Sequence, residues 1–329
     1  MEHCTTIGVD VSDRTSKICV MEKTRGGGRR VVVETTCATT KAGFSECFAK
    51  FGRTWPVVFE TGTHCRWMKS HFEGMGFETI VANPAEVKII TEHEVFTVAQ
   101  NLTPEEFEQA KKEVLEDAPC HASDGPKGDQ FEKAVRLYGA IVKTKKKFMV
   151  DTLAMRCWPE VILNEFYGIA VCSTMGHLTN HGHLCACEGD VYGAVMMRIG
   201  QELSGDKPFF CDLIICEGDY GVTWHCGAAP CGICKPGFQP ELRCSATVEG
   251  GGVKGVTDEF PLKGGRVTLA RLGEKRDGDG YRMLVCTGTG LDTDLFVRGN
   301  PLKIKFDAGC EAIRKEVIEN GWEHHYALM

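Results

Sequence analysis

Side chains that could bind a divalent metal ion gather in the second half of the chain. Glu188 follows a short apolar run, Asp212 ends the run Phe209–Asp212, and His324 and His325 stand next to each other near the end of the sequence. Two carboxylates and an imidazole suit a hard or borderline cation such as Mn²⁺ and leave coordination positions for substrate oxygens. These residue types predict a metal-dependent enzyme.

Such a site has a definite chemistry if its substrate is a polyol. The substrate would complete the coordination of the cation with two adjacent oxygens, a carbonyl and the neighbouring hydroxyl. The cation would make the α C–H more acidic, and Glu188 or Asp212 would take that proton and return it to the next carbon. The predicted reaction is aldose–ketose isomerisation through an enediol, with a small-molecule sugar as substrate.

The elements expected around these residues belong to an α/β layer and a β-rich domain. Residues 184–188 read as a short buried strand, so Glu188 would lie at a strand end before a helix, where open α/β sheets bind ligands. Residues 168–172 are expected to form another short buried strand, and a His-rich loop from His177 to His183 is expected between the two. Beyond Asp212 many glycines separate strand-like runs, which predicts an antiparallel barrel or sandwich, and a helix over residues 309–320 would lead to the two histidines.

The first third of the chain has a different pattern. Three strand-like runs up to residue 36 are followed by alternating helices and strands up to residue 82, the order of a ribonuclease-H-like α/β layer. Strand pairing would place Asp10 and Glu60 side by side, where they could hold Mg²⁺.

Three segments of this part, Ile7–Ser12, Glu60–His64 and Val81–Pro84, resemble the N-terminal DEDD nuclease domain of insertion-sequence transposases. Asp10 and Glu60 match the first two acidic residues of that motif. The resemblance calls for two more aspartates, three residues apart, soon after residue 84, and they are missing there. The nuclease site is therefore expected to be incomplete, its carboxylates vestigial, and DNA cleavage is not expected.

The later residues carry a second resemblance, to the L-fucose/L-arabinose isomerase group and its L-fucose isomerase-like members. The similar motifs are Arg156-Cys157-Trp158-Pro159, Cys187-Glu188-x-Asp190, Phe209-x₂-Asp212, Trp224-His225-Cys226-Gly227 and Gly321-x₂-His324-His325. The resemblance implies that Glu188 and Asp212 bind the metal, that one of them is also the base, and that His324 or His325 is the third ligand. Trp158 and His225 are candidates for substrate contacts; His225 is equally compatible with a structural role.

Together the resemblances divide the chain into an incomplete transposase-like domain over residues 1–91, part of a Rossmann-like α/β middle domain over 92–203 and a β-rich domain over 204–329. A homo-oligomer is implied for a working isomerase, and loss of its own N-terminal domain would impair it. Two alternatives stay open: a transposase-related protein that acts on DNA, and a chimera joined near residue 91 with no function as a unit.

The composition of the chain argues against several classes of protein. The formal charge of −7 comes without a strongly cationic stripe, which argues against unaided nucleic-acid binding, and no apolar run approaches the length of a membrane span. The 18 cysteines, with no leader-like start, indicate free thiols in a reducing cytoplasm. Two clusters with zinc-ligand residue types are interpreted as structural instead: Cys226, Cys231 and Cys234, and His177, His181 and His183.

Overall fold

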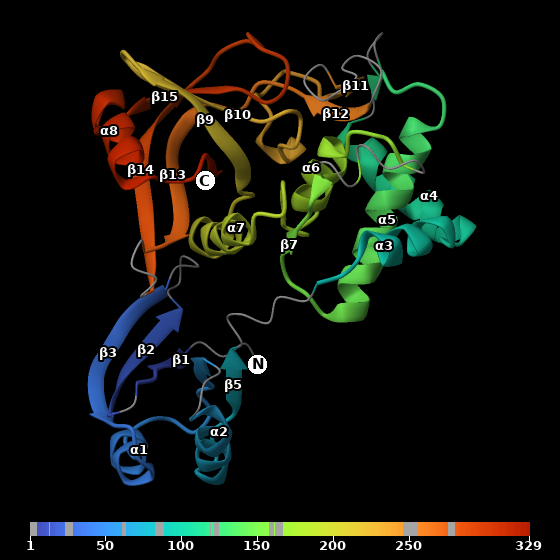
Figure 1. The fold of residues 1–329 in the computed structure, drawn as a ribbon. Coiled ribbons are helices and arrows are strands. Elements are labelled where there is room, and N and C mark those ends of the chain that lie inside the picture. The colour runs from blue at the N-terminus through green and yellow to red at the C-terminus, as the bar shows by residue number, and fades with distance from the viewer. Residues whose placement is uncertain are drawn as a thin grey trace. The chain divides into compact units, whose positions relative to one another are not determined.

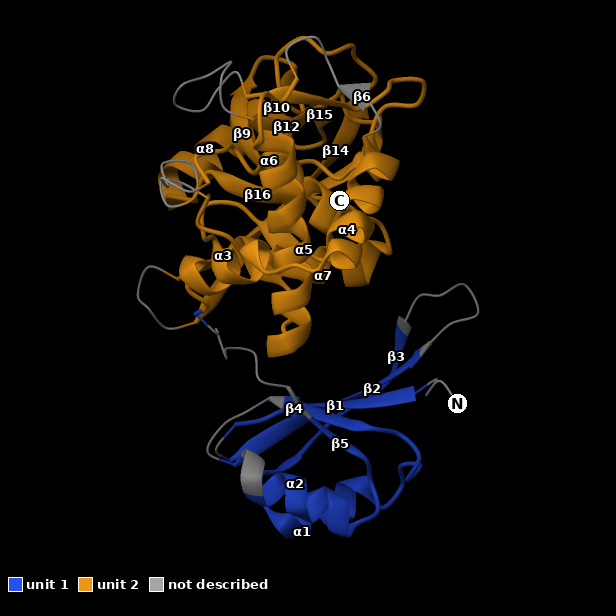
Figure 2. Ribbon diagram, turned by 90° about the vertical axis from the view of Figure 1, so that its right-hand side faces the viewer, with its two compact units in different colours: residues 1–89 blue, residues 90–329 orange. Residues whose placement is uncertain are grey.

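The structure is a computed structural model, and it describes residues 5–12, 14–23, 29–60, 64–82, 89–118, 120–121, 125–157, 161, 167–245, 255–275 and 280–329. The chain divides into two compact units, residues 1–89 and 90–329 (Figure 2). Each unit has its own hydrophobic core. The division into domains 1–91, 92–203 and 204–329 stays a prediction, and so does the type of each domain.

The N-terminal unit is a mixed sheet covered by two helices (Figure 1). Its elements are β1 (Thr5–Asp10), β2 (Thr15–Lys23), β3 (Arg29–Ala38), α1 (Lys41–Phe48), β4 (Val57–Glu60), α2 (Cys65–Gly74) and β5 (Thr79–Ala82). The strand order is β3-β2-β1-β4-β5, with antiparallel pairs among the first three strands and parallel pairs from β1 to β4 and from β4 to β5. The expected succession of three strands and then alternating helices and strands is confirmed.

Alternation along β1 decides which face of this sheet is covered. Ile7 and Val9 are buried in a core with Phe44 of α1 and Phe72 of α2, whose ring centroids lie 5.1 Å apart. Successive strand residues point to opposite faces, so Asp10 lies on the other face, where it is exposed.

The first part of the second unit is mainly helical. Its elements are α3 (Glu92–Gln100), α4 (Pro104–Asp117), β6 (Cys120–His121), α5 (Gln130–Phe148), β7 (Leu153–Ala154), α6 (Cys172–Asn180), β8 (Cys185–Ala186) and α7 (Val191–Ser204). β7 and β8 form a two-stranded parallel sheet. The start of α4 follows from its sequence, because Thr103 before the helix and Glu106 in its first turn make a capping box around Pro104.

Two expectations for this region are wrong. His177 lies inside α6, not in a loop, and residues 168–171 do not form a strand. A short apolar run has no periodicity that separates a strand from a fully buried helix, and eight of the nine residues of α6 are buried.

The rest of the second unit is a closed six-stranded antiparallel barrel, in the order β10-β15-β14-β13-β16-β9, so of the two expected architectures the barrel is confirmed. Its elements are β9 (Phe209–Glu217), β10 (Tyr220–Trp224), β13 (Gly265–Glu274), β14 (Tyr281–Leu291), β15 (Leu302–Phe306), α8 (Cys310–Asn320) and β16 (His325–Leu328). A short 3₁₀ helix, η2 (Cys231–Ile233), and the strands β11 (Glu241–Cys244) and β12 (Gly255–Glu259) lie between β10 and β13 in sequence.

The barrel has an inner core and an outer face that packs on the helical part. Along β9, Phe209 and Cys211 belong to the inner core, whereas Phe210 belongs to the core shared with the helices. Along β16, Tyr326 faces inward and Ala327 outward in the same way. The outer face of β16 contacts α7, which runs beside the barrel in Figure 1. In the part of the chain that the structure describes, no helix is both long enough and apolar enough to cross a membrane.

Candidate metal and active site

Strand pairing brings Asp212 and His325 together. The two residues are direct partners across the antiparallel pair of β9 and β16. By the alternation of each strand, both lie on the outer face of the barrel, toward α7. The Nε2 atom of His325 is 3.6 Å from Oδ1 of Asp212, and their side chains are 5% and 21% exposed.

Glu188 reaches the same place from the turn between β8 and α7. Its Oε2 atom lies 3.8 Å from Nε2 of His325 and also 3.8 Å from Nε2 of His324. The backbone of Glu188 has φ 55°, a left-handed conformation that residues other than glycine rarely adopt. Such conformations are concentrated at functional sites, where surrounding structure holds them in place.

Asp190 fixes the orientation of His325. One oxygen of its carboxylate accepts a hydrogen bond from the backbone N–H of Gly193 and so caps α7, at 2.7 Å. The other oxygen is 3.3 Å from Nδ1 of His325 and also contacts Arg271. Burial raises the pKa of Asp190, but hydrogen bonds from His325 and Arg271 outweigh it and lower that pKa to about 2. A carboxylate at Nδ1 leaves Nε2 of His325 as the nitrogen available to a metal.

Two groups of ligand atoms converge on His325. Glu188, His324 and His325 form one group and Asp212, His225 and His325 the other, with the ligand atoms of each group within 4.8 Å of one another. Oδ1 of Asp212 is buried and has no hydrogen-bond partner among the described residues. A buried carboxylate oxygen without a donor is costly unless a cation neutralises it. The donor set and this unpartnered oxygen therefore fit a divalent cation.

His225 lies at the edge of this cluster. It is 4% exposed, and its Nδ1 accepts a hydrogen bond of 2.9 Å from the backbone N–H of Cys226. In the neutral ring, an acceptor role at Nδ1 places the proton on Nε2. The sequence is compatible with two roles for His225, a substrate contact or a structural residue. Its role stays a prediction.

Two other candidates cannot be described: Trp158 lies outside the described residues, and so does the side chain of Glu60. The pairing of Val9 with Phe59 puts Asp10 and Glu60 at corresponding positions of adjacent strands, as expected. Asp10 belongs to the N-terminal unit and lines a hollow of about 840 Å³ on the open face of its sheet.

Comparison with known proteins points to a group of sugar isomerases. The chain is 34% identical over 258 residues to a sulfoquinovose isomerase of Alkalicoccus urumqiensis, which covers 74% of this chain and 54% of that protein. It is 30% identical over 248 residues to a sulfoquinovose isomerase of Clostridium sp. (strain MSTE9), covering 73% and 52%, and 33% identical over 183 residues to one of Priestia megaterium, covering 55% and 39%. The chain is homologous to sulfoquinovose isomerases. It spans about half the length, or less, of these curated relatives. No family model matches the chain.

These matches correct the family inferred from the sequence. The L-fucose/L-arabinose isomerase group joined to a transposase DEDD domain is the wrong assignment, because the relatives found are sulfoquinovose isomerases. The reason is that the motifs used were short sets of metal-ligand and proton-transfer residues. Such residues follow from a type of chemistry and do not by themselves identify a family.

Proposed function

We propose that this chain is a metal-dependent aldose–ketose isomerase that acts on sulfoquinovose or a similar sulfonated aldose. Its homology to sulfoquinovose isomerases supports the reaction type and the substrate class. The observation that carries the proposal is the convergence of Asp212 and Glu188 on Nε2 of His325, at 3.6 and 3.8 Å. The same carboxylates could bind a cation and transfer a proton on a substrate beside it.

The proposed metal ligands are Glu188, Asp212 and His325, with His324 as the more exposed alternative; the proposed cation is Mn²⁺ or another divalent ion. When bound, the cation would polarise the carbonyl oxygen of the sugar and so acidify the adjacent C–H. Asp190 would hold His325 through Nδ1 and keep its Nε2 directed at the carboxylates.

The carboxylates would also carry the proton. Glu188 or Asp212 takes the proton from the carbon next to the aldehyde, and the same group returns it to the former aldehyde carbon. A second proton moves between the two oxygens, so no atom is gained or lost. A carboxylate positioned in this way contributes roughly 10²–10⁴-fold to a rate. In the net reaction one C–H and one O–H bond break at the second carbon, and one C–H and one O–H bond form at the first.

Two finer structural proposals accompany the function. The strand order β3-β2-β1-β4-β5 supports a ribonuclease-H-like layer in the N-terminal unit. The parallel pair of β7 and β8 supports a partial Rossmann-like α/β domain beside the barrel. A homo-oligomer stays a prediction. The alternative of a DNA-acting protein, which rested on Asp10 and Glu60, gains no support from the relatives found.

The test is a direct assay of the full chain. Metal-free protein with added Mn²⁺ is incubated with sulfoquinovose, and formation of the ketose is followed by NMR. Conversion should stop on chelation and return with Mn²⁺. Asp212→Asn and Glu188→Gln should each lower the rate by about 100-fold or more.

Asp219→Asn is the matched control. Asp219 lies in the turn after β9 and is exposed, so this variant should keep the wild-type rate. An intact protein that binds Mn²⁺ and forms no ketose would overturn the proposed substrate. Equal rates for wild type and Asp212→Asn would overturn the site.

A further inference from the structure

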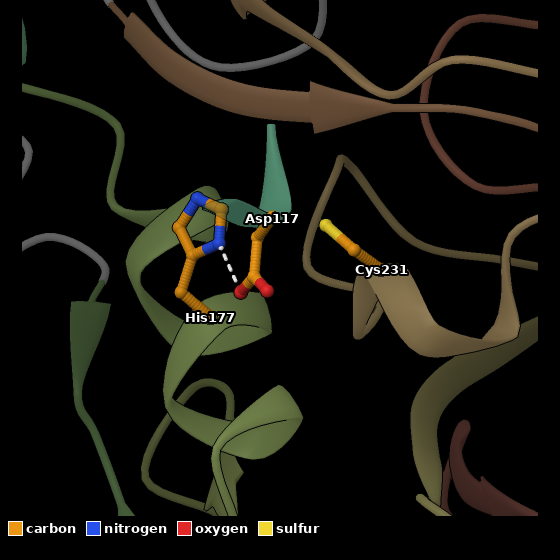
Figure 3. Close-up of side chains that lie close together, drawn as sticks. All are labelled: Asp117, His177 and Cys231. Atoms are coloured by element: carbon orange, nitrogen blue, oxygen red, sulfur yellow. Dashed lines mark hydrogen bonds and ion pairs between the residues drawn. The ribbon is translucent and has the colours of Figure 1, made fainter. Parts of the chain in front are cut away.

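A second cluster of metal-ligand side chains lies in the same unit, on elements that the proposed function does not use. Asp117 is the last residue of α4, His177 lies in α6 and Cys231 begins η2. One ligand atom from each of the three lies within 4.8 Å of the others (Figure 3). Three segments far apart in the sequence thus bring a carboxylate, an imidazole and a thiol to one point.

Hydrogen bonds already join two members of this cluster. Nδ1 of His177 is 2.9 Å from Oδ2 of Asp117, the contact drawn in Figure 3. Asn180 donates to the other oxygen of Asp117 at 2.5 Å, and Nε2 of His181 lies 3.2 Å from Oδ2. The Asp117 carboxylate is therefore held in place by three side chains of one segment.

Asp258 of β12 lies against the cluster from the other side. The thiol of Cys231 donates a hydrogen bond of 2.8 Å to Oδ2 of Asp258. Asp258 is 1% exposed, and its Oδ1 atom is buried without a hydrogen-bond partner among the described residues. A thiol is a weak donor, so this carboxylate is poorly compensated.

The charges of this cluster would be stabilised by a cation. Burying an ionised carboxylate is costly unless it is paired. Here Asp117 and Cys231 lie beside His177, which is 1% exposed, and Asp258, also 1% exposed, contacts the thiol. A divalent cation would neutralise this charge and give the free oxygen of Asp258 a partner. Imidazole nitrogen, thiolate sulfur and carboxylate oxygen together are the ligand types of Zn²⁺.

We propose that Asp117, His177, Cys231 and Asp258 form a structural Zn²⁺ site that joins α4, α6, η2 and β12. The ion would replace the thiol proton of Cys231, which leaves to solvent, and would bind Nδ1 of His177, while the proton now shared by Nδ1 and Asp117 moves to Nε2 of the same ring. Four protein ligands leave no open position, which is the arrangement of a structural zinc site and not of a catalytic one. The site shares no ligand with the candidate active site.

Co²⁺ is the probe that separates the two sites. A thiolate bound to Co²⁺ gives a charge-transfer absorption band in the near ultraviolet, and Glu188, Asp212, His324 and His325 supply no thiol. The metal-free chain titrated with Co²⁺ should develop this band. Zn²⁺ should then abolish the band by displacing Co²⁺, since Zn²⁺ lies above Co²⁺ in affinity for such ligands.

Matched variants show which cysteine gives rise to the Co²⁺ charge-transfer band. Cys231→Ser should remove it, and Asp117→Asn should weaken the apparent Co²⁺ affinity by about 10-fold or more. Cys234→Ser is the control, because Cys234 lies three residues away and its Sγ contacts the main-chain oxygens of Lys235 and Phe238. Cys234→Ser and Asp212→Asn should both keep the band. A wild-type protein without the band, or an undiminished band in Cys231→Ser, would overturn the proposal.

Thermal unfolding of the wild type tests the proposed zinc site even if Cys231→Ser does not fold. Zn²⁺ at about 100 times its dissociation constant should raise the Tm of the metal-free protein by about 5 °C or more. The Asp212→Asn variant should show the same rise, since its candidate active site is altered and the proposed zinc site is not. No rise in either protein would contradict a structural ion.

Discussion

At the scale of single residues, the neighbours His324 and His325 have unequal positions. The side chain of His325 is 5% exposed and is held at Nδ1 by Asp190, whereas that of His324 is 69% exposed. Both Nε2 atoms lie within 4 Å of the two carboxylates. A buried, oriented imidazole loses less conformational freedom on binding a metal than an exposed one. We therefore expect His325 to be the main histidine ligand.

His325→Asn should weaken Mn²⁺ binding by about 100-fold or more, and His324→Asn by less than about 10-fold. Isothermal calorimetry on the metal-free full chain measures both. His93→Asn serves as the control, because His93 is exposed near the start of α3, and it should leave the affinity unchanged. If His324→Asn causes the larger loss, the assignment of the two histidines is reversed.

At the scale of elements, the position of the site depends on the close approach of α7 to β9. Gly193 in the first turn of α7 faces the ring of Phe210, and a Cβ atom built at Gly193 would lie 2.2 Å from Cε2 of that ring. The same ring has its centroid 4.6 Å from that of His325. A glycine is needed here so that the helix can bring Glu188 and Asp190 to the face of the barrel that carries Asp212.

Gly193→Ala should therefore lower the free energy of unfolding by about 1–3 kcal/mol, although alanine is the better helix former. Displacement of Phe210 should also weaken Mn²⁺ binding. Chemical denaturation and calorimetry measure the two effects. Gly74→Ala in α2 is the control: nothing lies within 4 Å of a Cβ built there, so it should be neutral or slightly stabilising. Equal stability of wild type and Gly193→Ala would show that α7 does not pack this closely.

At the scale of the whole molecule, the candidate site belongs to one of two compact units. Glu188, Asp212, His324 and His325 all lie within residues 90–329, as do the four proposed zinc ligands. Among the described residues, the hydrophobic core that contains Ile7 and Phe44 is made of residues of the first unit. Metal binding is therefore expected to be a property of the second unit alone.

Limited proteolysis tests this division. Cleavage near residue 90, ahead of α3, should release a C-terminal fragment that is folded and keeps its Mn²⁺ affinity within about 3-fold, because all the proposed ligands lie beyond the cut. Mass spectrometry identifies the fragment and calorimetry measures its affinity. A fragment that unfolds, or that no longer binds Mn²⁺, would show that residues 1–89 contribute to the stability of the site.

Local sequence determined much of the secondary structure and the type of chemistry. Thr103 and Glu106 predict the start of α4 because a capping box involves only neighbouring residues. Alternation of apolar residues predicts β1 for the same reason. The prediction that Glu188, Asp212 and a terminal histidine bind a metal ion also came from the sequence, since residue type limits what a side chain can bind, and it stays a prediction. The choice between His324 and His325 did not come from the sequence.

Tertiary structure decided the rest, because ligand sites are built by pairing across elements. The register of β16 against β9 places His325 opposite Asp212, and nothing within either segment specifies that register. In the second cluster, His177 and Asp117 are 60 residues apart, and Cys231 comes from a third segment. Sequence spacing grouped His177 with His181 and His183, whereas the fold places it with a carboxylate and a thiol. Residues distant in the chain become ligands of one ion only when packing brings their elements together.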